Sequence, residues 1–132
     1  MLEKNPDHVK LVIKHFPVSS HKFAKQAATA ALAADKQGKF WEFHAKLFEN
    51  YRSLNDKKSE EIAVSLNLDM EKFAADKKSP EIQALITRDI RNGQAIGVRG
   101  TPSIYLNGKR VKNRSLQNFQ KLIDMEIKKT DK

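Results

Sequence analysis

The spacing of apolar residues changes along this chain, and that change most constrains the fold. Residues 9–16 place Val9, Leu11 and Ile13 on one face, with lysines opposite at 10 and 14, the period of two that is typical of a β-strand. Beyond Pro102, two short predicted strands, residues 103–106 and 109–111, flank Asn107-Gly108, a pair typical of a type I′ hairpin turn. The residues between these regions follow helical spacing. With no repeat or linker, the pattern predicts one domain over residues 1–132. We expect this domain to be α/β, dominated by helices, with three recognisable strands.

Several helices are expected between the strand regions and after the hairpin. The clearest is the stripe from Phe40 to Tyr51, with apolar residues at i, i+3, i+4 and i+7. Other starts are expected at N-capping residues, namely Ser19 or Ser20, Ser59, Asp69, Ser79 (followed by Pro80) and Ser115. Parallel strands need a crossover of roughly a dozen residues. The crossover here is far longer, so either a segment is inserted or a strand is absent.

The absence of cysteine excludes several kinds of chemistry. The chain contains no Cys, so by itself it can hold no disulfide, thiolate zinc site or thiol nucleophile. The four histidines lack the spacing of metal ligands on one helix, and we expect no metal and no cofactor. No apolar run approaches the roughly 20 residues of a membrane span, and no export signal follows Met1. We therefore expect no membrane partner, and a cytoplasmic protein if the chain is expressed as written.

The basic charge raises a nucleic-acid-binding alternative. The formal net charge is +9, but Lys and Arg are spread over all polar faces, and only residues 109–114 form a local cluster. Gly97-Val98-Arg99-Gly100 could be the loop of a KH domain, yet that loop lies between two helices, and here Thr101-Pro102 and a predicted strand follow. We therefore expect a solvated surface and no nucleic-acid partner.

Residues 97–108 form the most informative motif. Glycine permits backbone angles that other residues avoid, and Pro102 removes an N–H at the start of a strand. X-Pro bonds prefer trans only slightly, so a scaffold can hold Thr101–Pro102 in cis. A cis bond would turn the Thr101 backbone outward, where it could pair with an extended peptide. An ordinary helix-to-strand turn remains the alternative.

Four segments in order resemble the DsbA-like thiol–disulfide oxidoreductases of the thioredoxin superfamily. They are VKLVIKHFPV (9–18), the alanine-rich stretch 24–34, QGKFWEFH (37–44) and GVRGTPSIYLNG (97–108). The resemblance extends from Val9 to about Ile123. It implies a truncated thioredoxin-like fold with a helical insertion at about residues 39–96.

The resemblance also implies a substrate-binding site in this chain and a catalytic site that this chain lacks. Gly100, Thr101 and Pro102 would form the cis-proline loop, which binds an extended peptide or protein substrate. The family's first strand and its Cys-x-x-Cys helix would belong before Met1, so this domain would be N-terminally incomplete, with no catalytic residue. We therefore expect the C-terminal part of an oxidoreductase that is redox-inert alone. The alternative is a non-catalytic peptide-binding module that uses the same loop.

A missing first strand would leave two sheet edges unpaired, which is costly where they are buried. Strand 9–16 could shift to pair with residues 103–106, two copies could complete each other's sheet as a homodimer, or the chain is a fragment. We expect a fragment, with dimerisation as its accommodation. The family implies a periplasmic or otherwise extracytoplasmic location.

Overall fold

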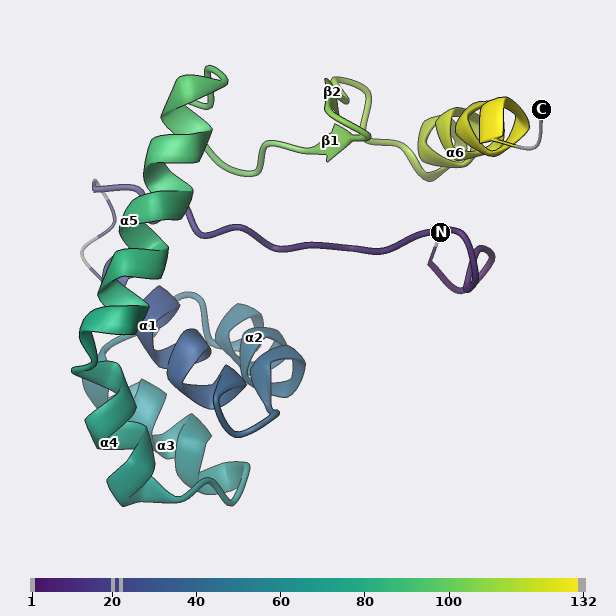
Figure 1. Ribbon diagram of the computed structural model, residues 1–132. Coiled ribbons are helices and arrows are strands. Elements are labelled where there is room, and N and C mark those ends of the chain that lie inside the picture. Colours follow the sequence, from purple (N-terminus) through teal and green to yellow (C-terminus); the bar gives the residue numbers. More distant parts are fainter. Residues whose placement is uncertain (1, 20, 22, 131–132) are drawn as a thin grey trace. The chain divides into compact units, whose positions relative to one another are not determined.

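The computed structural model describes residues 2–19, 21 and 23–130 (Figure 1). The elements in order are α1 (Ala24–Asp35), α2 (Phe40–Glu49), α3 (Asp56–Ser65), α4 (Met70–Lys77), α5 (Pro80–Ala95), β1 (Tyr105–Leu106), β2 (Lys109–Arg110) and α6 (Leu116–Thr130). They fall into two compact units, each described here by itself. The helical unit is residues 15–99, and the hairpin unit is residues 1–14 with 100–132. Among the described residues, every helix is too short or too polar to cross a membrane.

The helical unit is organised around α1, which contacts α2, α3, α4 and α5. The buried residues of α1 are mostly alanines, at positions 30, 31, 33 and 34. Because a methyl group occupies little space, the neighbouring helices can approach α1 closely. They supply the larger core side chains, Phe43 and Phe73, whose ring centroids lie 6.0 Å apart, with Ile82 and Ile86.

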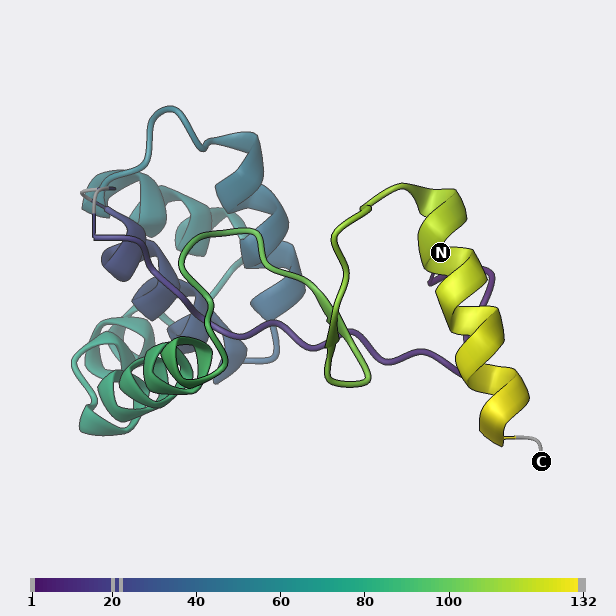
Figure 2. The ribbon, with the colours of Figure 1, turned by 90° about the horizontal axis from the view of Figure 1, so that it is seen from above.

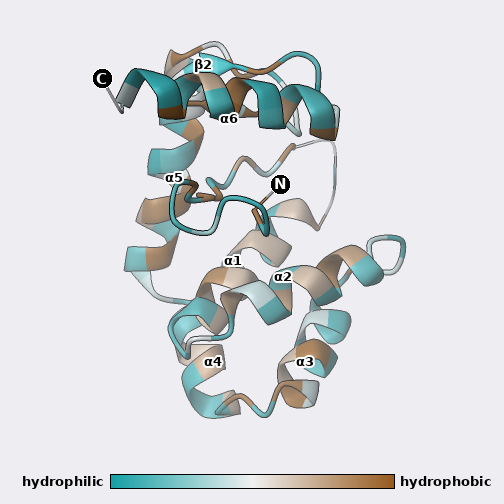
Figure 3. Ribbon diagram, turned by 90° about the vertical axis from the view of Figure 1, so that its right-hand side faces the viewer, coloured by the Kyte–Doolittle hydropathy of each residue, from teal (hydrophilic) through white to brown (hydrophobic). Residues whose placement is uncertain are grey.

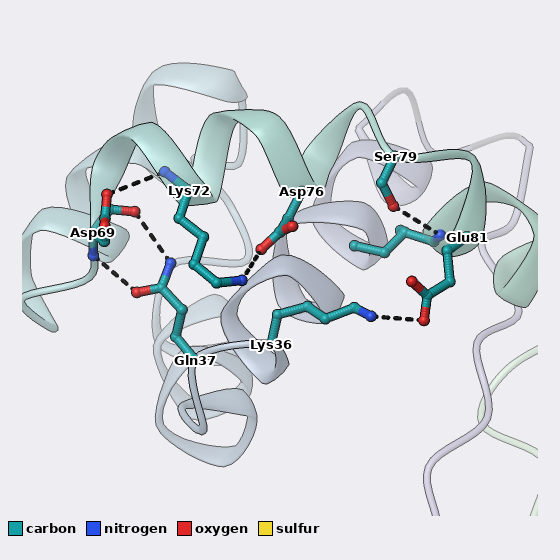
Figure 4. Close-up of polar contacts among 8 residues, drawn as sticks. Lys36, Gln37, Asp69, Lys72, Asp76, Ser79 and Glu81 are labelled. Carbon is teal, nitrogen blue, oxygen red and sulfur yellow. Dashed lines mark hydrogen bonds and ion pairs between the residues drawn. The ribbon is translucent and has the colours of Figure 1, made fainter.

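Helices α4 and α5 each start at a side-chain cap. Asp69 accepts a hydrogen bond from the Lys72 backbone N–H at 3.1 Å, and Ser79 accepts one from Ile82 at 3.2 Å (Figure 4). Both predicted caps are confirmed, as is Pro80 at the first turn of α5. The Gln37 side chain accepts from the Asp69 backbone N–H at 2.8 Å and donates to its carbonyl at 3.1 Å, which ties the end of α1 to the start of α4.

Two predicted helix starts are wrong. Helix α3 begins at Asp56 with Asn55 as its cap, whereas Ser59 lies inside the helix and is buried. Helix α1 has Phe23 at its N-cap position, with no side-chain cap. Ser20, the other proposed cap of this helix, lies outside the described residues. The buried face of α1 lies in its second half, at residues 29–34, so the start of this helix is not explained by core packing.

The hairpin unit combines a small sheet with α6. Strands β1 and β2 pair antiparallel, Tyr105 opposite Arg110, and the predicted turn is confirmed by positive φ angles of 46° at Asn107 and 82° at Gly108. Val111 and Ile123 are buried in this unit. The N-terminal turn is joined to α6 by Asn5, which exchanges two hydrogen bonds with Gln120, at 2.9 and 3.2 Å.

The prediction of three strands is wrong, because the described residues contain only β1 and β2. Residues 9–16 follow an extended path but form no strand in the described structure, and Leu11 and Val12 are 44% and 63% exposed. Alternation determines which face of a strand would be buried, but a strand also needs a partner for its backbone hydrogen bonds. The helix-dominated α/β class is otherwise as predicted.

Candidate functional site

The predicted peptide-binding loop lies in the hairpin unit, just before β1. Gly100, Thr101 and Pro102 are all exposed, and the Thr101–Pro102 peptide bond is cis. The Ser103 hydroxyl donates a hydrogen bond of 2.7 Å to the Gly100 carbonyl, which closes the loop on itself. Next to the loop, the Val111 backbone N–H donates a hydrogen bond of 2.8 Å to the Ile104 carbonyl and continues the hairpin pairing. The loop thus extends from a hydrogen-bonded hairpin into solvent.

Gly100 and Gly97 differ in their backbone requirements. A Cβ at Gly100 would meet no atom within 4 Å, so this position has room for a side chain. Gly97 has a φ of +88°, a conformation that other residues rarely adopt. The glycine requirement of the motif therefore lies at Gly97, whereas Gly100 is an open position.

A second candidate site lies in the helical unit, where rings from two segments form a cluster. The ring cluster consists of His15, Phe40, Trp41, His44 and Phe48. His15 meets Phe40 edge-on at 6.0 Å, and His44 stacks on Phe40 at 5.5 Å and meets Phe48 at 4.9 Å between ring centroids. Trp41 and Phe48 are 50% and 66% exposed. The cluster therefore presents aromatic surface to solvent around two imidazoles.

Burial controls the protonation of both imidazoles. Loss of solvent around the His15 ring lowers its pKa below the ordinary value, an effect that outweighs the attraction of the nearby Asp89 carboxylate. Burial also lowers the pKa of His44. Both rings are consequently neutral at pH 7 and can accept a proton only under more acidic conditions.

Asp89 fixes the chain at His15. Its carboxylate accepts a 3.0 Å hydrogen bond from the His15 backbone N–H and lies 3.3 Å from Arg88. The residue is 5% exposed. A buried carboxylate on α5 thus holds the segment that carries the first imidazole of the cluster.

The sequence predicted the loop at residues 100–102, whose peptide binding stays a prediction, but gave no prediction of the ring cluster. His44 is half-buried among aromatic rings, and His15 is brought to them from a segment that was predicted to be a strand. The 3.6-residue stripe of α2 was the one available signal for the cluster. His8 and His21 are exposed and lie outside it. In the described part of the chain, no three His, Asp or Glu side chains form a group that could hold a metal ion.

Without a thiol, these two sites can bind and exchange protons, but cannot form a mixed disulfide, because that reaction requires a thiolate. Exposed loop backbone can pair with an extended peptide, and exposed aromatic rings can bury apolar surface of a partner. Both are properties of a binding surface rather than of a complete redox centre.

Comparison with known proteins places the chain in a family. A family model described as Thioredoxin matches residues 1–125. A probable disulfide bond formation protein D of Bacillus cereus is 30% identical, over 92% of this chain and 59% of that protein. A Na(+)/H(+) antiporter NhaA of Herminiimonas arsenicoxydans is 32% identical, over 80% of this chain and 17% of the antiporter.

A solved structure agrees with these sequence matches. The crystal structure of a thioredoxin-like oxidoreductase from Silicibacter pomeroyi DSS-3 has a TM-score of 0.72 and 28% sequence identity, and covers 88% of this chain and 66% of that one. The chain therefore spans less than two thirds of the length of each of these relatives. Because the family model covers residues 1–125, the chain belongs to the thioredoxin family, as its resemblance predicted.

Proposed function

We propose that this chain is the substrate-binding, C-terminal part of a DsbA-like thiol–disulfide oxidoreductase and is redox-inert alone. The observation that carries the proposal is the family match over residues 1–125 in a sequence without cysteine. Family membership supports thiol–disulfide chemistry for the whole protein. The missing thiol means that the reactive sulfur comes from outside this sequence.

The contribution of this chain would be to hold the substrate. An extended peptide pairs with the exposed backbone of residues 100–102, while a thiolate supplied from elsewhere attacks the substrate disulfide. The attack forms a mixed disulfide between the supplied thiol and one substrate sulfur, and the other substrate sulfur leaves as a thiolate. Neither sulfur of the mixed disulfide is on this chain. A homodimer that completes the sheet and an extracytoplasmic location belong to the same proposal, the latter in line with the disulfide bond formation relative.

Two assays test this function. In an insulin-reduction assay with dithiothreitol, the chain alone should give no turnover above the uncatalysed rate. In a fluorescence-anisotropy titration with a labelled extended peptide, the chain should bind, and Thr101→Arg should abolish binding because the long side chain covers the loop backbone. Thr87→Arg is the matched control, since Thr87 is an exposed threonine of α5 outside the loop.

The results separate the two parts of the proposal. Catalytic turnover by the chain alone would refute redox inertness. Identical titration curves for wild type and Thr101→Arg would refute peptide binding at the loop. A homodimer should have twice the monomer mass by light scattering, and a compact monomer would remove that part of the proposal.

The second candidate function is peptide binding without any redox chemistry, and the exposed loop backbone favours it equally. The two differ once a dithiol is supplied. If a strand and a Cys-x-x-Cys helix are fused ahead of Met1, the oxidoreductase proposal expects insulin turnover. If the fused protein binds the peptide with unchanged affinity but gives no insulin turnover, the oxidoreductase proposal is refuted and the peptide-binding function is supported.

A further inference from the structure

One face of α6 and the N-terminal turn form a concave surface within the hairpin unit. The cavity measures about 670 Å³, in the size range of ligand sites in proteins. We call it the basic groove, and it is lined by Lys4, Leu116, Gln117, Gln120, Lys121, Asp124, Met125 and Lys128. The N-terminal turn and α6 lie side by side in both views (Figures 1 and 2).

The walls of the basic groove are held together by a pair of amide side chains, of which Asn5 is buried and Gln120 partly exposed. Asn5, 6% exposed, exchanges two hydrogen bonds with Gln120 on α6. Gln120 also donates to the Asp124 carboxylate at 2.9 Å. This pair of amide–amide hydrogen bonds ties the N-terminal turn to α6, so the two segments that line the groove are connected within the unit.

The lining combines positive charge with exposed apolar side chains. Lys4, Lys121 and Lys128 face a single acid, Asp124, which already accepts a hydrogen bond from Gln120. Leu116 is 72% exposed and Met125 47% exposed, and both line the groove. The ribbon of α6 carries hydrophobic segments among hydrophilic ones (Figure 3). The charge extends beyond the groove, because residues 1–14 and 100–132 contain eleven Lys and Arg against five Asp and Glu.

We propose that the basic groove binds an acidic amphipathic peptide segment of a partner protein. Its carboxylates would pair with the groove lysines, and its apolar side chains would cover Leu116 and Met125. Complementary charge speeds encounter and fixes orientation, whereas burial of the apolar side chains provides affinity. A nucleic acid would satisfy the lysines, but its phosphate backbone would leave both apolar side chains in water.

A second cavity in the chain provides a contrast. It measures about 480 Å³ and lies in the helical unit. Its charged lining residues are Lys25, Lys77, Lys78, Asp56 and Glu60. Charges of both signs line that cavity and no large apolar side chain does, so it lacks the two features that select an acidic amphipathic peptide.

The test is a fluorescence-anisotropy titration of the full chain with a labelled peptide in which Leu and Glu alternate. Reversal of one groove charge, Lys121→Glu, replaces an attraction with a repulsion and should weaken binding about tenfold. The matched control is Lys112→Glu, which makes the same charge change at an exposed lysine of the same unit outside the groove. Leu116→Ser should also weaken binding several-fold. Circular dichroism verifies that each variant is folded.

Three further probes distinguish the partners. A peptide with Lys in place of Glu, a peptide with Ser in place of Leu, and duplex DNA should each bind at least tenfold more weakly than the Leu–Glu peptide. Equal affinity for the Ser–Glu peptide would show that the groove attracts negative charge without recognising apolar side chains, and would overturn the proposal. DNA binding as tight as that of the Leu–Glu peptide, or equal losses for Lys121→Glu and Lys112→Glu, would overturn the proposal. None of these results depends on residues 100–102.

Discussion

Gly93→Ala should destabilise the helical unit only while Phe16 is present. Gly93 lies inside α5, and a Cβ built there would come within 2.9 Å of two ring carbons of Phe16. Carbon atoms at optimal contact are about 3.5–4.0 Å apart, so the ring has to move. The substitution therefore probes how tightly the extended segment at residue 16 packs on α5.

Two effects of opposite sign set the magnitude. Replacing a helical Gly with Ala stabilises by about 1 kcal/mol, whereas overpacking costs typically about 1–3 kcal/mol. In the wild-type background the sum is a loss of roughly 0–2 kcal/mol of unfolding free energy. In a Phe16→Ala background the clash disappears, and the same substitution should stabilise by about 1 kcal/mol.

Urea denaturation followed by circular dichroism and by the fluorescence of Trp41, the one tryptophan in the chain, measures these differences. Gly97→Ala is the matched control. Gly97 has a φ of +88° and no atom within 4 Å of a built Cβ, so its substitution should destabilise equally in both backgrounds. If Gly93→Ala has the same effect with and without Phe16, the packing of this segment on α5 is refuted.

Three further predictions concern the same unit. Because burial lowers the folded-state pKa of His15 and His44, the unfolded state binds more protons, and stability should fall as the pH drops below the ordinary value of 6.5. Thermal unfolding from about pH 8 to about pH 5 measures this, and a His44→Phe variant with an unchanged pH slope would contradict it. Asp89→Ala leaves the His15 backbone N–H without its carboxylate acceptor and should cost about 1–3 kcal/mol in urea denaturation, more than Asp89→Asn. Ser79→Ala removes the cap of α5 and should cost about 1 kcal/mol, a loss that Ser79→Asp restores.

Local signals predicted much of the fold. The stripe in α2, the Ser79 cap and the Asn107-Gly108 turn each depend on a few neighbouring residues, and all three are present in the structure. Residues 9–16 failed as a strand because a ladder needs a partner, and the partner cannot be identified from alternation. The start of α1 was predicted at a serine cap, whereas the helix begins after Phe23 without a side-chain cap.

The candidate sites divide in the same way. Residues 100–102 could be predicted as a candidate site because Gly and Pro mark unusual backbone directly in the sequence, and peptide binding there stays a prediction. The ring cluster depends on a contact between His15 and Phe40, which are distant along the chain, and on the hydrogen bond from His15 to Asp89. The basic groove likewise joins Lys4 to α6. No local pattern encodes such long-range contacts.

The alanine face of α1 has a consequence for how this protein can vary. Four helices surround α1, so an extra methylene at Ala33 or Ala34, both 0% exposed, would displace several of them together. Exposed positions of those helices are free of this constraint. Substitutions, whether they arise in evolution or by design, should therefore be tolerated at exposed positions of the surrounding helices and rarely at the buried alanines of α1.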